Sequence, residues 1–149
     1  MFLTCAACFV LTVASAVMPW INAELVLLSF TTTASSPGMI AVFVVVATAG
    51  QMTGKMALYA AGCRGSRAPS ARMARLLGAW RPRCEAHPRR ADWLVLVSST
   101  IGIPPFIATS LLAGALRMQI ARFVVAGSIG RLIRFATLGA VGDLVVSAL

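Results

Sequence analysis

Apolar residues fill the chain on both sides of one basic block, and this division constrains the fold more than any other feature. Of the 149 residues, 59% are hydrophobic and 11% are charged, and the mean hydropathy is +0.89. Soluble domains carry about 25% charged residues, so a soluble core explains this composition poorly. A helix needs roughly 20 apolar residues to cross a bilayer. The chain is therefore expected to form one integral membrane domain over residues 1–149.

The basic block covers residues 63–92 and holds eight of the 13 Lys and Arg residues, in a chain with a formal charge of +9. Cytoplasmic loops of membrane proteins carry such an excess of positive residues. We predict that this block is a cytoplasmic loop, which accounts for the charge without nucleic-acid binding. Apolar residues recur at helical spacing over 70–80, which predicts an interfacial helix on the membrane surface.

Two of the apolar segments are long and continuous, and two are broken. Residues 39–62 and 117–149 are each long enough to form a transmembrane helix. Residues 19–38 are interrupted by Glu24 and a Thr/Ser-rich run, and residues 93–116 by Gly102 and a proline pair. Broken segments of this kind are typical of re-entrant hairpins, which are tolerated where they are buried in protein or line a cavity. Residues 1–18 are expected to form a retained N-terminal helix, because no Lys or Arg precedes their apolar run as it would in a signal peptide.

The two halves of the chain resemble each other at an offset of 80 residues. Residues 43–62 and 123–142 share seven identities, and each copy follows a broken segment. With the basic loop in the cytoplasm, the first span runs inward and the second outward, as in the inverted repeats of many transporters. The predicted fold is an all-α polytopic membrane protein with two inverted repeats, each a re-entrant helical hairpin followed by a transmembrane helix, plus an N-terminal helix.

Three ionisable residues are expected inside the membrane. A helix that starts near 118 carries Arg131 and Arg134 roughly 20 Å into a core about 30 Å thick, on one helical face. Glu24 lies in the first broken segment. Arginine at that depth costs at least about 2.5–3.5 kcal/mol, so such residues are functional candidates. Two interpretations stay open. In the first, a Glu24–arginine ion pair only holds helices in register.

In the second interpretation the same residues form a binding site. The planar guanidinium groups of Arg131 and Arg134 suit a phosphate headgroup. Glu24 is then a proton-coupled counter-charge, and two cations with one acid favour an anion as the substrate. The weaker candidates for the lining of the same cavity are Asn22, Gln51, Lys55, Pro104 and Pro105.

Other motifs have structural explanations. Gly50-x-x-x-Gly54 permits close helix packing. Cys5 and Cys8 lie in an apolar helix, and Cys84-x-x-His87 lacks an obvious fourth ligand for zinc even with distant Cys63. No nucleophile–base pair or metal cluster indicates catalysis. We therefore predict neither an enzyme nor a metal site nor a cofactor.

Three stretches carry a resemblance to a known family. They are MPWINAELVLLSF (18–30), ATAGQMTGKMALYAAG (47–62) and IGIPPFIATSLLAGALRMQIARFVVAGSIGRLIRF (101–135). In this order they resemble the DedA family, also called the VTT-domain or SNARE-associated Golgi protein family, and its short YqaA-like bacterial branch. The resemblance implies two re-entrant hairpins and the movement of lipids or lipid phosphates. It also matches Glu24, Arg131 and Arg134 to a proposed proton-coupled site.

The chain departs from the family at one position. Many longer members have a proline–glycine–x–arginine pattern in the second hairpin, whereas this chain has IPPF, with Phe106 in place of the arginine. We therefore leave open whether the substrate is shared.

The sequence predicts a transporter, flippase or scramblase for an anionic lipid, such as undecaprenyl phosphate or a phospholipid, and proton coupling is part of this hypothesis. The alternative is a non-transporting membrane protein that assists envelope organisation or membrane-protein assembly. The expected location is the bacterial plasma (inner) membrane, with several crossings and a homo-oligomeric state. Membrane lipids are the expected partners.

Overall fold

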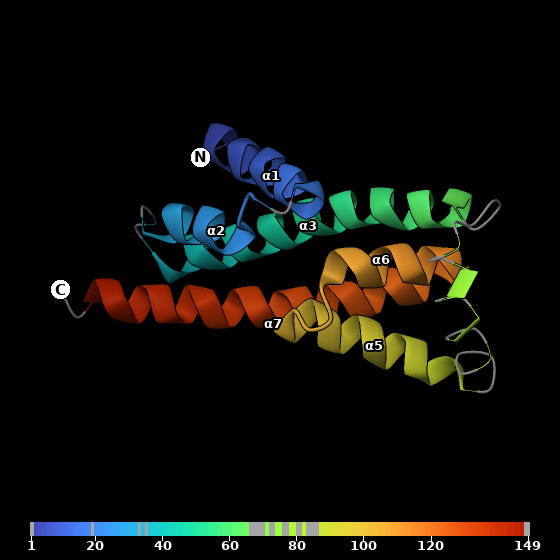
Figure 1. Cartoon of the computed structure of the whole chain (residues 1–149). Coiled ribbons are helices and arrows are strands. Elements are labelled where there is room, and N and C mark those ends of the chain that lie inside the picture. The colour runs from blue at the N-terminus through green and yellow to red at the C-terminus, as the bar shows by residue number, and fades with distance from the viewer. Residues whose placement is uncertain are drawn as a thin grey trace. The chain divides into compact units, whose positions relative to one another are not determined.

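The computed structural model contains six described helices and no strand within the residues that it describes. Those residues are 2–18, 20–32, 34, 36–65, 71, 74–75, 78–79, 82 and 87–147, without the side chains of 88 and 142–147. The helices are α1 (Phe2–Val17), α2 (Ala23–Thr31), α3 (Pro37–Gly65), α5 (Pro88–Ile101), α6 (Phe106–Ala115) and α7 (Ile120–Ser147) (Figure 1). The predicted all-helical architecture is confirmed for this part of the chain.

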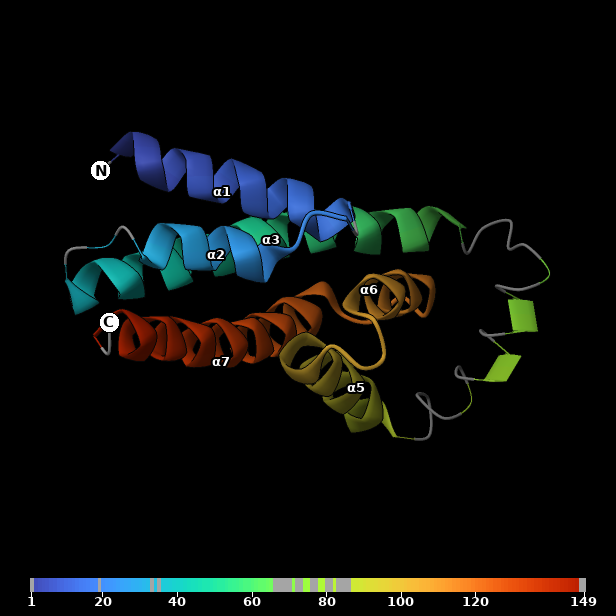
Figure 2. The ribbon, with the colours of Figure 1, turned by 60° about the vertical axis from the view of Figure 1, so that its left-hand side comes forward.

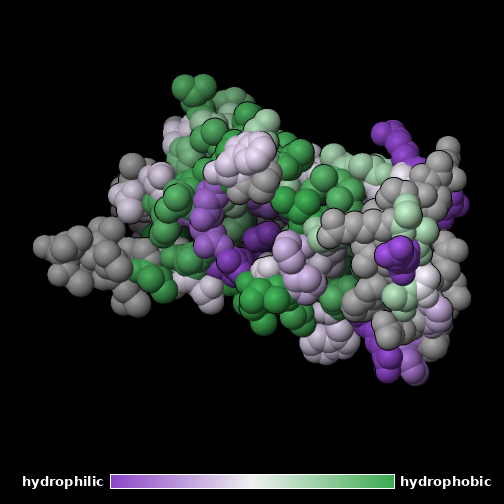
Figure 3. Space-filling view, in the orientation of Figure 1, coloured by the Kyte–Doolittle hydropathy of each residue, from purple (hydrophilic) through white to green (hydrophobic). Residues whose placement is uncertain are grey.

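Two of the described helices are long and apolar enough to cross a membrane. They are α3, with 29 residues, and the stretch Ile120–Val141 of α7, with 22 residues. At 1.5 Å per residue the 29 residues extend about 44 Å, more than a hydrocarbon core requires. Large hydrophobic side chains are also exposed on several helices, among them Val10, Val45 and Val125. Hydrophobic residues cover much of the face that Figure 3 shows.

The chain forms two compact units, each with one pair of short helices. The first unit is Met1–Gly54 with Arg131–Leu149, and the second is Lys55–Gly130. α1 packs on α2 in the first unit, and α5 packs on α6 in the second (Figure 2). Helices α3 and α7 are each divided between the two units, α3 after Gly54 and α7 after Gly130.

The first helix pair differs from the expected hairpin. The sequence predicts both arms of a hairpin within 19–38, but the described part of this range holds the single nine-residue helix α2. The partner of α2 is α1, the helix that the sequence analysis places outside the repeat. Two arms do not fit because so short a segment leaves no room for a second helix beside α2. The order of two short helices and one long helix therefore occurs twice along the chain. The inverted orientation and the re-entrant placement stay predictions.

The core of the first unit joins α1, α2, α3 and the second part of α7. Its buried residues are Cys8, Leu27, Phe43, Val44, Ala47 and Phe135. Gly50 and Gly54 let α3 approach α1 closely, since a Cβ atom at Gly50 would lie 2.7 Å from the carbonyl oxygen of Phe9, and one at Gly54 2.8 Å from that of Val13. The two glycines thus have the packing role that their spacing predicts.

The second unit has its break where glycine and proline predict it. Helix α5 ends at Ile101, Gly102 adopts a left-handed φ of 88°, and α6 begins at Phe106. Ser98 closes this turn because its hydroxyl donates to the carbonyl oxygen of Pro104 at 2.7 Å and accepts from Thr109 Oγ1 at 2.9 Å. Pro104 and Pro105 are exposed residues of this turn.

Aromatic and glycine contacts hold the rest of the second unit together. Tyr59 stacks on Phe123 with ring centroids 5.2 Å apart, and Phe106 lies 6.2 Å from the same ring. A Cβ atom at Gly114 would lie 2.8 Å from the carbonyl carbon of Tyr59, so the end of α3 crosses α6 with backbones in close approach. Most of the predicted interfacial helix 70–80 lies outside the described residues.

Candidate functional site

The candidate site in the first unit begins with Glu24, in the first turn of α2. Asn22 caps this helix, since its side-chain oxygen accepts a hydrogen bond from the backbone N–H of Glu24 at 2.9 Å. A carboxylate in the first turn is stabilised by the helix dipole. Asn22 therefore satisfies the backbone N–H of Glu24 and fixes the start of α2, as asparagine commonly does at the N-cap of a helix.

Arg134 on α7 binds the carboxylate of Glu24. Its Nε donates to Glu24 Oε1 at 2.7 Å, and its Nη2 donates to the same oxygen. The exposed fractions of the two side chains are 25% for Arg134 and 30% for Glu24. The pair therefore lies in a partly sheltered position that a ligand or a proton can still reach.

Arg131 lies one helical turn before Arg134 and completes the cluster. Its guanidinium carbon lies 5.7 Å from the centroid of the Phe135 ring, which is fully buried. The charges of Arg134 and Glu24 both act on Arg131. We call Glu24, Arg131 and Arg134 the charge cluster. Its two cations and one anion give a formal charge of +1, which favours an anionic ligand.

Gln51 also belongs to the first unit but bonds with α1. Its side chain is 2% exposed, and its Nε2 donates to Ser15 Oγ at 2.6 Å. Ser15 in turn donates to the carbonyl oxygen of Thr12 at 2.8 Å. Gln51 therefore forms a buried polar tie between α3 and α1, whereas the sequence analysis places it in a cavity lining with Arg131.

Lys55 is buried in the second unit, at an exposure of 2%. Its Nζ lies 5.4 Å from the ring centroid of Phe106, the first residue of α6. A cation over an aromatic face is stabilised by the ring quadrupole. Phe106, which replaces the arginine expected from the family pattern, is therefore the aromatic partner of a buried cation. Pro104 and Pro105 precede it directly.

Comparison of the chain with protein-family models, curated proteins and solved structures gives no match. Membership of the DedA family stays a prediction.

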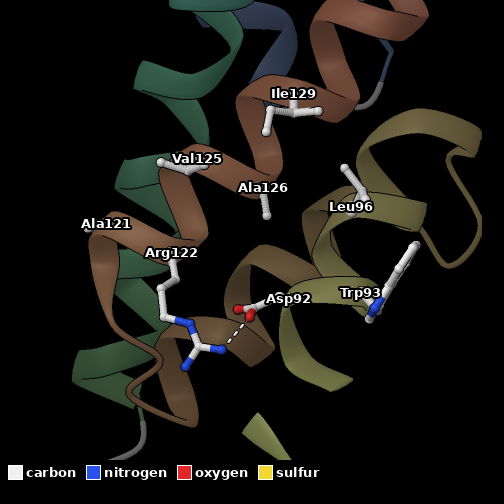
Figure 4. A pocket seen from close by; sticks show the side chains of 8 residues that line it. All are labelled: Asp92, Trp93, Leu96, Ala121, Arg122, Val125, Ala126 and Ile129. Carbon is white, nitrogen blue, oxygen red and sulfur yellow. Dashed lines mark hydrogen bonds and ion pairs between the residues drawn. The ribbon is translucent and has the colours of Figure 1, made fainter. Parts of the chain in front are cut away.

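An ion pair between Asp92 and Arg122 is a feature that the sequence analysis does not identify. Arg122 Nη2, at the start of α7, donates to Asp92 Oδ2 in the first part of α5 (Figure 4). Asp92 is one of only four acidic residues in the chain and stands next to Trp93 at the start of an apolar segment. This position is the one sequence signal that could have indicated an ion pair.

The cysteine and histidine motifs do not meet as a cluster in the described part of the chain. There, no group of three His, Cys, Asp or Glu side chains is arranged to hold a metal ion. Cys5 and Cys8 belong to the apolar packing of the first unit, and Cys63 Sγ donates to the carbonyl oxygen of Gly114 at 3.1 Å. Cys84 lies outside the described residues, so the Cys84–His87 motif is not tested.

Proposed function

We propose that this chain is an integral membrane protein of the DedA type that moves an anionic lipid across the bilayer, with the charge cluster as its headgroup site. The contact of Arg134 with Glu24 beside Arg131 is the observation that carries the proposal. The contact joins Glu24, near one end of the chain, to Arg134, near the other, with Arg131 three residues before Arg134. A net positive cluster in which Arg134 is 25% and Glu24 30% exposed suits a phosphate group rather than a cation.

The chemistry assigns a role to each member of the cluster. Arg131 and Arg134 bind phosphate oxygens, because their guanidinium groups donate paired hydrogen bonds in a fixed plane. Glu24 competes with the phosphate for Arg134. Protonation of Glu24 weakens that competition and frees the Arg134 donors for the substrate. Headgroup binding and proton uptake are thereby coupled without any covalent step.

The remaining parts of the proposal concern placement. The two long apolar helices support a membrane location, and the basic block supports a cytoplasmic position for residues 63–92. From the family resemblance we further propose that the protein lies in a bacterial plasma membrane and forms a homo-oligomer. The proposed substrate is undecaprenyl phosphate or a phospholipid.

The proposal is tested with purified protein in proteoliposomes that contain a fluorescent lipid phosphate. Translocation is measured by chemical quenching of the outer leaflet, with and without a pH gradient. We expect wild type to translocate the lipid, and Arg131→Gln and Arg134→Gln to lose this activity while they remain folded. Arg64→Gln, at an exposed arginine near the end of α3, is the matched control and retains it. Glu24→Gln is expected to translocate without a response to the pH gradient.

A non-transporting role is the second candidate, and the Glu24–Arg134 ion pair favours it because such a pair also ties α2 to α7. This role predicts no translocation by wild type and a loss of folding in the Arg134 and Glu24 variants. Circular dichroism and gel filtration of each variant separate the two candidates.

A further inference from the structure

A groove with one charged end lies between α5 and the first part of α7. None of its lining residues belongs to the charge cluster. It has a volume of about 410 Å³, within the about 300–1,000 Å³ that is usual for small-molecule sites. Helix α5 contributes Asp92, Trp93 and Leu96, and α7 contributes Ala121, Arg122, Val125, Ala126 and Ile129 (Figure 4). We call this the α5–α7 groove.

The charged end of the groove is formed by Asp92 and Arg122. Arg122 uses Nη2 for its bond to Asp92, and its Nε and Nη1 have no bond to any residue that the structure describes. Arg90 and Arg89 are exposed in the first turn of α5, two and three residues before Asp92. They lie in the sequence just before the groove lining and add positive charge to this end of α5, while Arg122 in the lining itself offers N–H donors to an anion.

The other end of the groove is apolar and lies deeper along the spanning helix. Arg122 is the third residue of the candidate span Ile120–Val141, so in a membrane it lies at headgroup level. Ile129 is seven residues further on, about 10 Å deeper at 1.5 Å per residue. Trp93, which follows Asp92 in α5, is 64% exposed, and tryptophan is enriched at the membrane–water interface.

We propose that the α5–α7 groove binds one anionic phospholipid, with its phosphate at Arg122 and an acyl chain along Leu96, Val125 and Ile129. The order of groups along the groove, from Arg122 through Trp93 to aliphatic side chains, matches the order of groups along a phospholipid. The site depends on the membrane placement proposed above, but it depends neither on transport nor on the charge cluster.

Trp93 provides a direct probe of this site. The other two tryptophans are replaced, as Trp20→Phe and Trp80→Phe, and the single-tryptophan protein is reconstituted in phosphatidylcholine vesicles. A fixed fraction of the lipid is phosphatidylglycerol or phosphatidylcholine with brominated acyl chains, which quench tryptophan on contact. We expect the brominated phosphatidylglycerol to quench Trp93 at an about fivefold lower mole fraction, since one arginine near the surface contributes about 1 kcal/mol to the binding of an anionic lipid.

Three variants test the contacts. Arg122→Gln combined with Asp92→Asn removes both charges without leaving an unpaired ion, and is expected to abolish the preference for phosphatidylglycerol. Ala126→Phe fills the groove without a change of charge and is expected to reduce quenching by the anionic lipid. Ala108→Phe, at an exposed alanine of α6, is the matched control and keeps wild-type quenching.

Three results would overturn the proposal. Equal quenching by the two brominated lipids would indicate ordinary lipid contact without a site. A preference that survives in the double variant would place the anion elsewhere. An absence of quenching together with cross-linking of Val125→Cys between chains would assign the groove to a second copy of the protein. If wild type shows the preference but fails to translocate lipid, the site stands and the proposed transport fails.

Discussion

Arg134 directs two of its nitrogens at a single oxygen of Glu24, a residue 110 positions earlier in the chain. This contact ties the first turn of α2 to the second part of α7. In the proposed function the same arginine also binds a phosphate. The two roles make different predictions for variants that keep or remove the charge.

Loss of the Glu24 charge is expected to lower the stability of the first unit. Glu24→Gln replaces a charge-assisted bond by a neutral one and leaves Arg134 without its counter-charge, at a cost of about 1–3 kcal/mol in the free energy of unfolding. Glu24→Asp keeps the charge and is expected to lose less. Thermal unfolding in detergent, followed by fluorescence, measures the difference. Equal midpoints for wild type and Glu24→Gln would show that the pair contributes nothing to stability.

Gly50 and Gly54 of α3 are expected to tolerate no larger residue. Gly50→Ala brings a methyl group against Thr12 and the carbonyl oxygen of Phe9, and such overpacking usually costs about 1–3 kcal/mol. Gly65→Ala is the matched control, since no atom lies within 4 Å of a Cβ atom at that position. We expect Gly50→Ala to lower the unfolding midpoint in detergent, while Gly65→Ala leaves it unchanged or raises it slightly. A similar effect of both changes would contradict the close approach of α3 to α1.

The hydroxyl group of Ser98 is expected to stabilise the turn between α5 and α6. Ser98→Ala removes a hydrogen bond to the Pro104 carbonyl and leaves Thr109 without its acceptor at Ser98. Loss of a buried hydrogen bond of this kind costs about 1–3 kcal/mol. Ser29→Ala, at an exposed serine of α2, is the comparison. Hydrogen exchange of the amide groups of α6 should accelerate in Ser98→Ala alone, and unchanged exchange would argue against this role.

Local signals predicted much of this fold. Gly102 and the two prolines after it predict the break in the second half because glycine allows a left-handed φ and prolines cannot continue a helix. The spacing of Gly50 and Gly54 predicts close packing. The contact of Glu24 with an arginine follows from the high cost of an unpaired charge among apolar residues.

Other contacts between distant segments were beyond the same reasoning. The pairing of α1 with α2 depends on which apolar faces meet, and apolar periodicity does not identify the partner of a face. Gln51 illustrates the difficulty, because a buried amide serves equally well in a cavity or in a tie to Ser15. The ion pair of Asp92 with Arg122 joins α5 to α7 across 30 positions and has no local signature.

Phe106 and Lys55 provide the last prediction, because the resemblance to the DedA family predicts an arginine where this chain has Phe106. Phe106→Arg brings a second cation to the buried Nζ of Lys55 and removes the ring contact with Phe123. Phe106→Leu loses only the aromatic contributions, about 1–3 kcal/mol together. We expect stability in detergent to fall in the order wild type, Phe106→Leu, Phe106→Arg. Combination of Phe106→Arg with Lys55→Met removes the repulsion and should recover part of the loss. Equal stability of Phe106→Arg with and without Lys55→Met would show that the two positions do not interact, and the aromatic ring would then have only a packing role.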